Sequence, residues 1–108
     1  MVHGIIGIEK DSLVELILHE KPLMILLGLK YSGGKAYPAM LSKYADCTYS
    51  HTVKILNVLK ENGLINFEKD GRIKYAILTE RGEEVAFLLD QIYQKLTKIS
   101  REIKRNQE

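Results

Sequence analysis

The chain has 108 residues and a nearly balanced charge, with 16 Lys and Arg against 14 Asp and Glu and a formal net charge of +2. This length is typical of a single domain with a modest core, and so small a net charge does not by itself predict an anionic partner. The single cysteine, Cys47, can form no internal disulfide, and the histidines lack metal-site spacing, so we expect no metal, no cofactor and a reducing, cytoplasmic location. The longest apolar run, residues 23–29, is far shorter than the roughly 20 residues of a membrane-spanning helix, so we expect no membrane insertion.

The first third of the sequence predicts two helices. We assign no structure to residues 1–11. Ser12 and Glu15 have the spacing of a capping box, so a first helix is expected to begin there. Pro22 disfavours helix at Lys21 and suits the first position of a new helix, which predicts a break or kink at Lys21.

After the Gly33-Gly34 loop, the sequence predicts a short helix over residues 38–45, PAMLSKYA. Pro38 can open this helix, because its missing N–H is not needed in the first turn. Helical spacing predicts that three of its side chains face inward, namely Met40, Leu41 and Tyr44. Residues 46–47 then form a turn.

A longer helix follows this turn. Thr48 is a good N-cap for it, and Gly63 is expected to end it in a left-handed conformation. Its predicted inner stripe contains Val53, Leu56, Leu59 and Lys60, and its outer side contains Lys54, Asn57 and Glu61.

Residues 64–78, LINFEKDGRIKYAIL, alternate apolar and polar side chains around Asp70-Gly71 and predict a β-hairpin. A two-residue loop at Asp70-Gly71 would place Phe67 opposite Lys74 and put the two apolar sets on opposite faces. We therefore favour a three-residue loop, Lys69-Asp70-Gly71, with Gly71 left-handed in a G1 bulge. This register pairs Phe67 with Ile73, and Ile65 with Tyr75.

The last predicted element is a long helix over residues 79–105, capped by Thr79. Apolar residues recur along it at steps of four, three, four, three and four, which is the pattern of a heptad seam. The seam extends beyond what a small domain can cover, so we expect a homodimer held by a coiled coil. The expected dimerisation residues are Val85, Leu89, Ile92, Leu96, Ile99 and Ile103.

Three strings, in this order, carry a resemblance to a known family: PAMLSKYADCTYSHTVKILNVLKENGLI, KDGRIKYAIL and LTERGEEVAFLL. They cover residues 38–89, about half of the chain. With the predicted elements, they resemble the winged helix-turn-helix DNA-binding fold and, within it, small archaeal MarR-like transcriptional regulators. The resemblance implies an α+β, mainly α, fold in one winged-helix domain over residues 1–108. Residues 12–78 would form the helical core, the helix-turn-helix and the β-hairpin wing, and residues 79–105 the C-terminal dimerisation helix.

The same resemblance implies a non-enzymatic transcriptional regulator that binds double-stranded DNA sequence-specifically as a homodimer. The regulator's third helix, here the helix capped by Thr48, would enter the major groove, where residues near the helix start touch base edges. Its wing would lie on the backbone or in the minor groove. The expected DNA contacts are Tyr49, Ser50, His51, Lys54 and Asn57 from the helix, and Lys69, Arg72 and Lys74 from the wing.

Each of these groups has a simpler interpretation. Tyr49, Ser50 and His51 are also suitable as solvated residues of a capped first turn, and lysines at a hairpin tip commonly protect an edge strand. Cys47 is expected to be a small turn residue rather than a redox sensor, and the sequence identifies no small-molecule effector. The alternative function is a winged-helix protein-interaction or chromatin-associated scaffold module that does not read DNA sequence.

Overall fold

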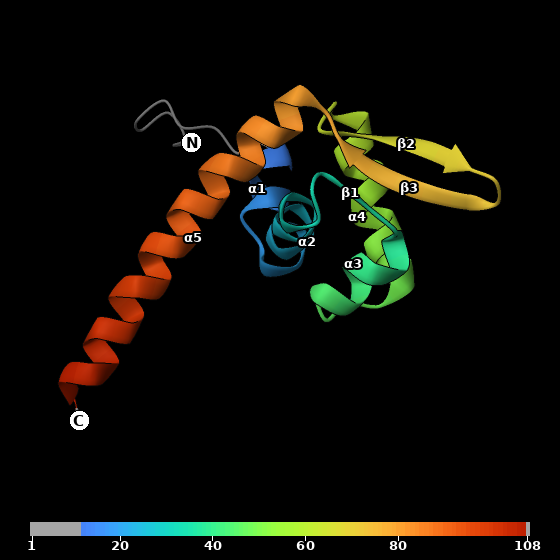
Figure 1. Cartoon of the computed structure of the whole chain (residues 1–108). Coiled ribbons are helices and arrows are strands. Elements are labelled where there is room, and N and C mark those ends of the chain that lie inside the picture. Colours follow the sequence, from blue (N-terminus) through green and yellow to red (C-terminus); the bar gives the residue numbers. More distant parts are fainter. Residues whose placement is uncertain (1–11, 108) are drawn as a thin grey trace.

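The computed structural model describes residues 12–107 and consists of five helices and a three-stranded sheet (Figure 1). In chain order the elements are α1 (Ser12–Ile17), α2 (Glu20–Tyr31), β1 (Lys35–Ala36), α3 (Pro38–Tyr44), α4 (Tyr49–Glu61), β2 (Ile65–Asp70), β3 (Ile73–Leu78) and α5 (Glu80–Gln107). No helix in the described range is both long and apolar enough to cross a bilayer.

Helix α2 forms the centre of the hydrophobic core. It packs against α1, α3, α5 and the sheet, and a helix surrounded in this way has apolar residues on every side. Its fully buried side chains are those of Ile25, Leu26, Leu27 and Leu29. Gly28 allows a close approach, because a Cβ atom built there would lie 2.9 Å from Cδ2 of Tyr44.

The break between α1 and α2 lies at residues 18–19, so the predicted break at Lys21 is wrong by two to three residues. His19 has an extended backbone, with φ −96° and ψ 157°, and its carbonyl accepts the N–H of Leu23 at 3.1 Å. Pro22 is therefore the third residue of α2, where it costs no hydrogen bond because the first four N–H groups of a helix have no intrahelical partner. The predicted capping box at Ser12 depends on a side chain outside the described part of the chain.

Helix α3 begins at Pro38 as predicted, but only one of its three expected inward-facing side chains is buried. Leu41 is 1% exposed, whereas Met40 and Tyr44 are 41% and 43% exposed. A helix of seven residues has only two turns, so a single side chain at its centre can be fully covered from one direction.

Helix α4 confirms both predicted ends. The Thr48 hydroxyl accepts the backbone N–H of His51 at 3.1 Å, and Gly63 has a φ of +75°. The buried stripe differs from the prediction and consists of Thr52, Ile55, Leu56 and Leu59, while Val53 is half-buried and Lys60 exposed. Thr52 can be buried because its hydroxyl donates to the Thr48 carbonyl at 2.9 Å, which no sequence periodicity reveals.

The sheet has the antiparallel order β1-β3-β2, and its hairpin register contradicts both predicted loops. The loop is Gly71-Arg72, so Asp70 pairs with Ile73 and Phe67 pairs with Ala76. Gly71 has a φ of +65° at the first loop position, where a type II′ turn favours glycine.

This register follows from the side chains of β3 that face the core. Ala76 and Leu78 are buried in step with Phe67 and Ile65 on β2. The larger apolar residues of β3, Ile73, Tyr75 and Ile77, lie on the other face. The prediction assigned them to the core because of their size and hydrophobicity.

Helix α5 begins as predicted, with the Thr79 hydroxyl accepting the N–H of Gly82 at 3.0 Å. Its first half packs on the body, where Ala86 and Leu89 are buried. The Tyr31 hydroxyl donates to the Asp90 carboxylate, which ties the end of α2 to α5 and raises the pKa of Tyr31. Gln94, one turn further on, also donates to the Tyr31 hydroxyl at 3.3 Å, and the rest of α5 then continues away from the body (Figure 1).

Candidate nucleic-acid interface

The start of α4 presents a polar surface held in place by the Thr48 cap. Tyr49, Ser50 and His51 form its first turn and are all exposed, and Tyr49 keeps 59% of its surface. Lys54 and Asn57 continue this exposed side further along the helix. The backbone N–H groups and the dipole at such a helix start attract anions, including phosphate.

A groove of about 330 Å³ separates α4 from the wing, which is the hairpin of β2 and β3. Four of the predicted contact residues line it: Tyr49 and Asn57 from α4, and Arg72 and Lys74 from the wing. Ser50, His51 and Lys54 are exposed on α4 outside the lining, and Lys69 is exposed on β2. The fold thus brings half of the predicted residues around one concavity and places the others beside it.

The observed register places the two wing lysines on one face. Lys69 and Lys74 are cross-strand partners, and they share the strand face of Phe67. The Lys74 ammonium lies 4.1 Å from the centroid of the Phe67 ring. Two like charges directly opposite each other are unfavourable in a sheet, and an anion bound between them would relieve the repulsion.

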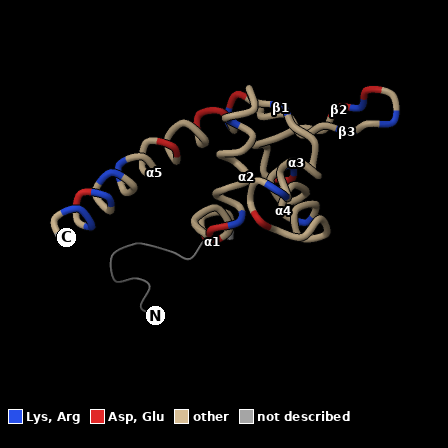
Figure 2. The backbone as a smooth tube through the Cα atoms, turned by 60° about the horizontal axis from the view of Figure 1, so that its bottom comes forward, with Lys and Arg blue, Asp and Glu red and all other residues tan. Residues whose placement is uncertain are grey.

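None of the three wing cations forms an ion pair within residues 12–107. Arg72 occupies the second loop position at the tip, beyond the last cross-strand pair. Figure 2 shows basic residues at this tip and again along the far half of α5. The three wing cations are therefore unpaired within the described part of the chain, although the acidic Asp70 lies beside them at the tip.

An aromatic pair that the sequence did not predict joins α3 to the wing. Tyr37, directly before α3, stacks on Tyr75 of β3 with ring centroids 4.7 Å apart, and Tyr37 also lines the groove. The Tyr75 hydroxyl donates to the Tyr37 hydroxyl at 3.3 Å, which raises the pKa of Tyr75. This pair becomes recognisable only once the hairpin register places Tyr75 on the outer face.

Lys35 of β1 strengthens this junction. Its ammonium donates to the Glu68 carboxylate at 3.0 Å and lies 4.3 Å from the centroid of the Tyr75 ring. Exposed ion pairs are individually weak, about 0–1 kcal/mol, so the contact contributes mainly by orienting the wing relative to α3 and α4.

The predicted dimerisation residues fall into two groups. Leu89 is buried in the chain's own core and Val85 packs against that core. The other four are exposed, at 55% for Ile92, 60% for Leu96, 42% for Ile99 and 52% for Ile103. Leu88, also 60% exposed, lies one helical turn before Ile92 and extends the exposed stripe; the strict heptad pattern selected Leu89 instead.

No cluster of three or more His, Cys, Asp or Glu side chains within residues 12–107 has the arrangement of a metal site. Cys47 is half-buried in the turn between α3 and α4.

The candidate interface as a whole consists of the polar start of α4, the groove and the hairpin wing with its basic residues. This combination can bind an anionic polymer.

Comparisons with known proteins find one relative by sequence and several similar solved structures. No family model matches the chain. An uncharacterised protein of Archaeoglobus fulgidus is 26% identical over 80 residues, covering 71% of this chain and 84% of the relative.

Several solved structures match the fold of this chain. A crystal structure from Archaeoglobus fulgidus matches with a TM-score of 0.67 and 23% identity over 79% of this chain and 97% of the other. Sso10a-2, a DNA-binding protein from Sulfolobus solfataricus, matches with a TM-score of 0.57 and 18% identity over 77% and 92%. A MarR family transcriptional regulator from Silicibacter pomeroyi matches with a TM-score of 0.63 and 20% identity over 73% and 58%. The chain thus has the winged helix-turn-helix fold expected from its sequence, in the form found in MarR-like regulators.

Proposed function

We propose that the protein is a cytoplasmic, non-enzymatic transcriptional regulator that binds double-stranded DNA sequence-specifically as a homodimer. Helix α4 enters the major groove, and the wing contacts the backbone or the adjacent minor groove. The observation that carries this proposal is the groove between α4 and the wing, which Tyr49 and Asn57 line from α4 and two unpaired cations, Arg72 and Lys74, line from the wing.

The proposed contacts fall into two classes. Ser50, His51 and Lys54 lie at the exposed start of α4, where side chains can reach base edges. Arg72 and the two wing lysines offer point charges suited to phosphates, which position a protein on DNA without reading sequence. Tyr49 and Asn57 lie between these classes, on the groove lining.

The homodimer is proposed from the exposed apolar stripe on α5. Four large aliphatic side chains from Ile92 to Ile103 are about half exposed on a helix that leaves the body, which is costly for a monomer in water. Pairing with a second copy would bury this stripe and place two α4 helices on one symmetric particle.

A titration with duplex DNA at two salt concentrations tests the proposal. Neutralising several phosphates releases counterions, so the logarithm of the affinity should fall steeply and linearly with the logarithm of the salt concentration. A pool of random duplexes then identifies the preferred sequence, and a scrambled duplex is the control.

The second candidate is a protein-interaction or chromatin-associated scaffold module. The outer sheet face favours it, because Tyr37, Ile73 and Tyr75 are at least partly exposed there. This module would bind duplexes weakly with little salt dependence, or bind all sequences equally. Either result would displace sequence-specific regulation as the function.

A further inference from the structure

The positive charge of the chain is concentrated in the last part of α5. Residues 95–107 contain five basic residues and one acidic residue, Glu102, so their formal net charge is +4. Residues 12–94, which include α4 and the wing, contain ten basic and ten acidic residues and are neutral overall. A strongly basic surface therefore lies outside the candidate nucleic-acid interface.

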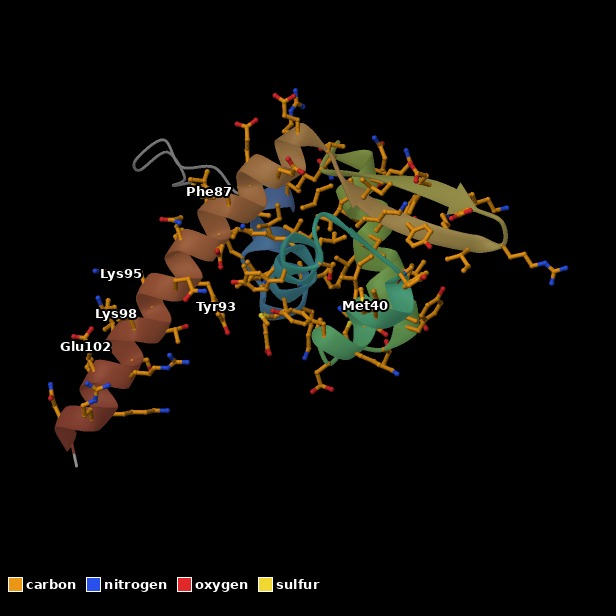
Figure 3. The ribbon with its side chains drawn as sticks, in the orientation of Figure 1. Met40, Phe87, Tyr93, Lys95, Lys98 and Glu102 are labelled. Atoms are coloured by element: carbon orange, nitrogen blue, oxygen red, sulfur yellow. The ribbon has the colours of Figure 1, made fainter. Side chains whose placement is uncertain are left out.

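Three of these cations form a row along the helix. Lys98, Arg101 and Arg105 are separated by three and four residues, so they lie on one face of α5 over an axial distance of about 10.5 Å. All three are exposed, and none forms an ion pair within residues 12–107. Figure 3 shows Lys98 on the side of α5 away from the body, whereas Tyr93 is on the side facing it. These three cations form the outer face of α5.

The outer face lies opposite the exposed apolar stripe. Each of its cations follows a stripe residue by two positions, which is about 200° around the helix. The stripe residues concerned are Leu96, Ile99 and Ile103. Burying the stripe against a second copy would therefore leave the outer face in water.

The helix dipole does not explain this row of charges. Cations stabilise the last turn of a helix, which accounts for Lys104 and Arg105. Lys98 and Arg101 lie before the last turn, where this effect has fallen off. Lys98 lies one turn before Glu102, but a Lys that precedes a Glu is in the less favourable order for pairing along a helix. The row is therefore available to an external anion.

We propose that the outer face of α5 is a second binding surface for duplex DNA, which contacts phosphates without reading sequence. The choice of partner rests on the proposed function, because a protein held on DNA by α4 meets other duplex segments at high local concentration. Each strand of B-DNA carries a phosphate about every 3.4 Å along the helix axis, so three cations within about 10.5 Å match consecutive phosphates of one strand. The planar guanidinium groups of Arg101 and Arg105 can each bind phosphate oxygens through two hydrogen bonds.

This surface is separate from the groove between α4 and the wing. Figures 1 and 2 both place the wing tip and the C-terminal end of α5 on opposite sides of the body. The outer face therefore binds a duplex segment other than the one that α4 reads. An anionic membrane suits α5 less well, because a cationic amphipathic helix binds a bilayer by inserting its apolar side, and the homodimer buries that side.

Removing two of the cations tests the surface in the full-length protein. Lys98→Gln with Arg101→Gln removes one Lys and one Arg and keeps good helix formers. On a scrambled duplex this outer-face variant should flatten the salt dependence of binding by about two phosphate equivalents. The ratio of cognate to scrambled affinity should stay within about twofold of the original, because phosphate contacts do not read sequence. An unchanged salt slope would overturn the proposal.

Lys60→Gln with Arg81→Gln is the matched control. It also removes one Lys and one Arg, and both residues are exposed and lie outside the outer face and the groove lining. Its salt slope should equal that of the original protein. A control that flattens the slope as much as the outer-face variant would show that only net charge matters and would also overturn the proposal.

A wing variant, Arg72→Ala with Lys74→Ala, separates this proposal from the proposed function. If the wing variant flattens the slope and the outer-face variant does not, the second surface fails and the proposed function stands. If the outer-face variant flattens the slope but the original protein prefers no sequence, sequence-specific regulation fails and the second surface stands. An original protein that binds no duplex would overturn both.

Vesicles of equal parts phosphatidylglycerol and phosphatidylcholine test the competing anionic surface. The original protein should bind them no better than vesicles of phosphatidylcholine alone. Binding to the anionic vesicles that the outer-face variant weakens, together with an unchanged DNA salt slope, would overturn the proposal in favour of a membrane.

Discussion

Arg72 lies at the wing tip with no ion-pair partner among residues 12–107, so replacing it should remove charge without breaking an internal contact. Arg72→Ala should weaken binding to cognate and scrambled DNA alike and flatten the salt slope by about one phosphate equivalent. Arg81→Ala removes the same charge from the first turn of α5, outside the groove lining, and is the matched control. Equal slopes for the original protein and Arg72→Ala would remove Arg72 from the interface.

At the front of α4, Ser50 and His51 should instead determine sequence preference. Both are exposed and neither side chain forms the cap, since Thr48 accepts the backbone N–H of His51. Replacing both by Ala should leave the melting temperature unchanged and reduce the preference for the cognate site by about 1–3 kcal/mol per lost base contact. The measurement is the ratio of cognate to scrambled affinity at fixed salt.

His19→Ala is the control for this double variant, because it removes an exposed histidine from the junction of α1 and α2. It should leave the affinity ratio unchanged. An unchanged ratio in the Ser50 and His51 double variant as well would mean that these residues only solvate the helix start.

At the scale of the elements, features that depend on neighbouring residues could be predicted and features that depend on distant packing could not. The caps at Thr48 and Thr79 and the left-handed Gly63 follow from local hydrogen bonding and backbone sterics, and all three are confirmed. The hairpin register depends on which side of β3 meets the core. The alternating large apolar residues Ile73, Tyr75 and Ile77 were predicted to face the core, and this prediction is wrong.

The candidate site divides in the same way. Each predicted residue of α4 and the wing is exposed, because helix amphipathicity and hairpin tips are visible in one sequence. The groove, and the place of Tyr37 in its lining, depend on the register of β3 and on the packing of α3. Both are features of tertiary structure that local sequence patterns do not contain. Lys69 and Lys74 share a face only in the observed register.

The junction between the sheet and α5 gives a prediction for stability. A Cβ atom at Gly82 would lie 1.9 Å from the carbonyl oxygen of Leu64, so the backbones must move apart in Gly82→Ala. Overpacking of this kind costs about 1–3 kcal/mol, and we expect a loss near the upper end in urea unfolding. Ser100→Ala, at an exposed position of the same helix, is the control. A Gly82→Ala protein as stable as the original would show that this contact is not close in solution.

At the scale of the whole molecule, the exposed stripe of α5 should decide the oligomeric state. Leu96→Gln with Ile99→Gln should convert the dimer into a monomer, because burying each aliphatic side chain contributes about 1.5–3 kcal/mol. Sedimentation equilibrium measures this change. Phe87→Gln is the control, since Phe87 is 53% exposed but lies on another side of the helix. A double variant that remains dimeric would place the interface elsewhere.

A symmetric dimer with two α4 helices also predicts the form of its DNA site. Sequences selected from a random pool should be inverted repeats, with half-site centres separated by one or more helical turns of about 10–10.5 base pairs. Because the second half-site binds intramolecularly, the dimer should prefer the full repeat to a single half-site by a factor of about 10²–10⁴. The Leu96 and Ile99 double variant should retain half-site binding and lose this preference. Selected sites without two-fold symmetry, or a monomeric variant that still prefers the full repeat, would show that the two helix-turn-helix units do not read DNA as a pair.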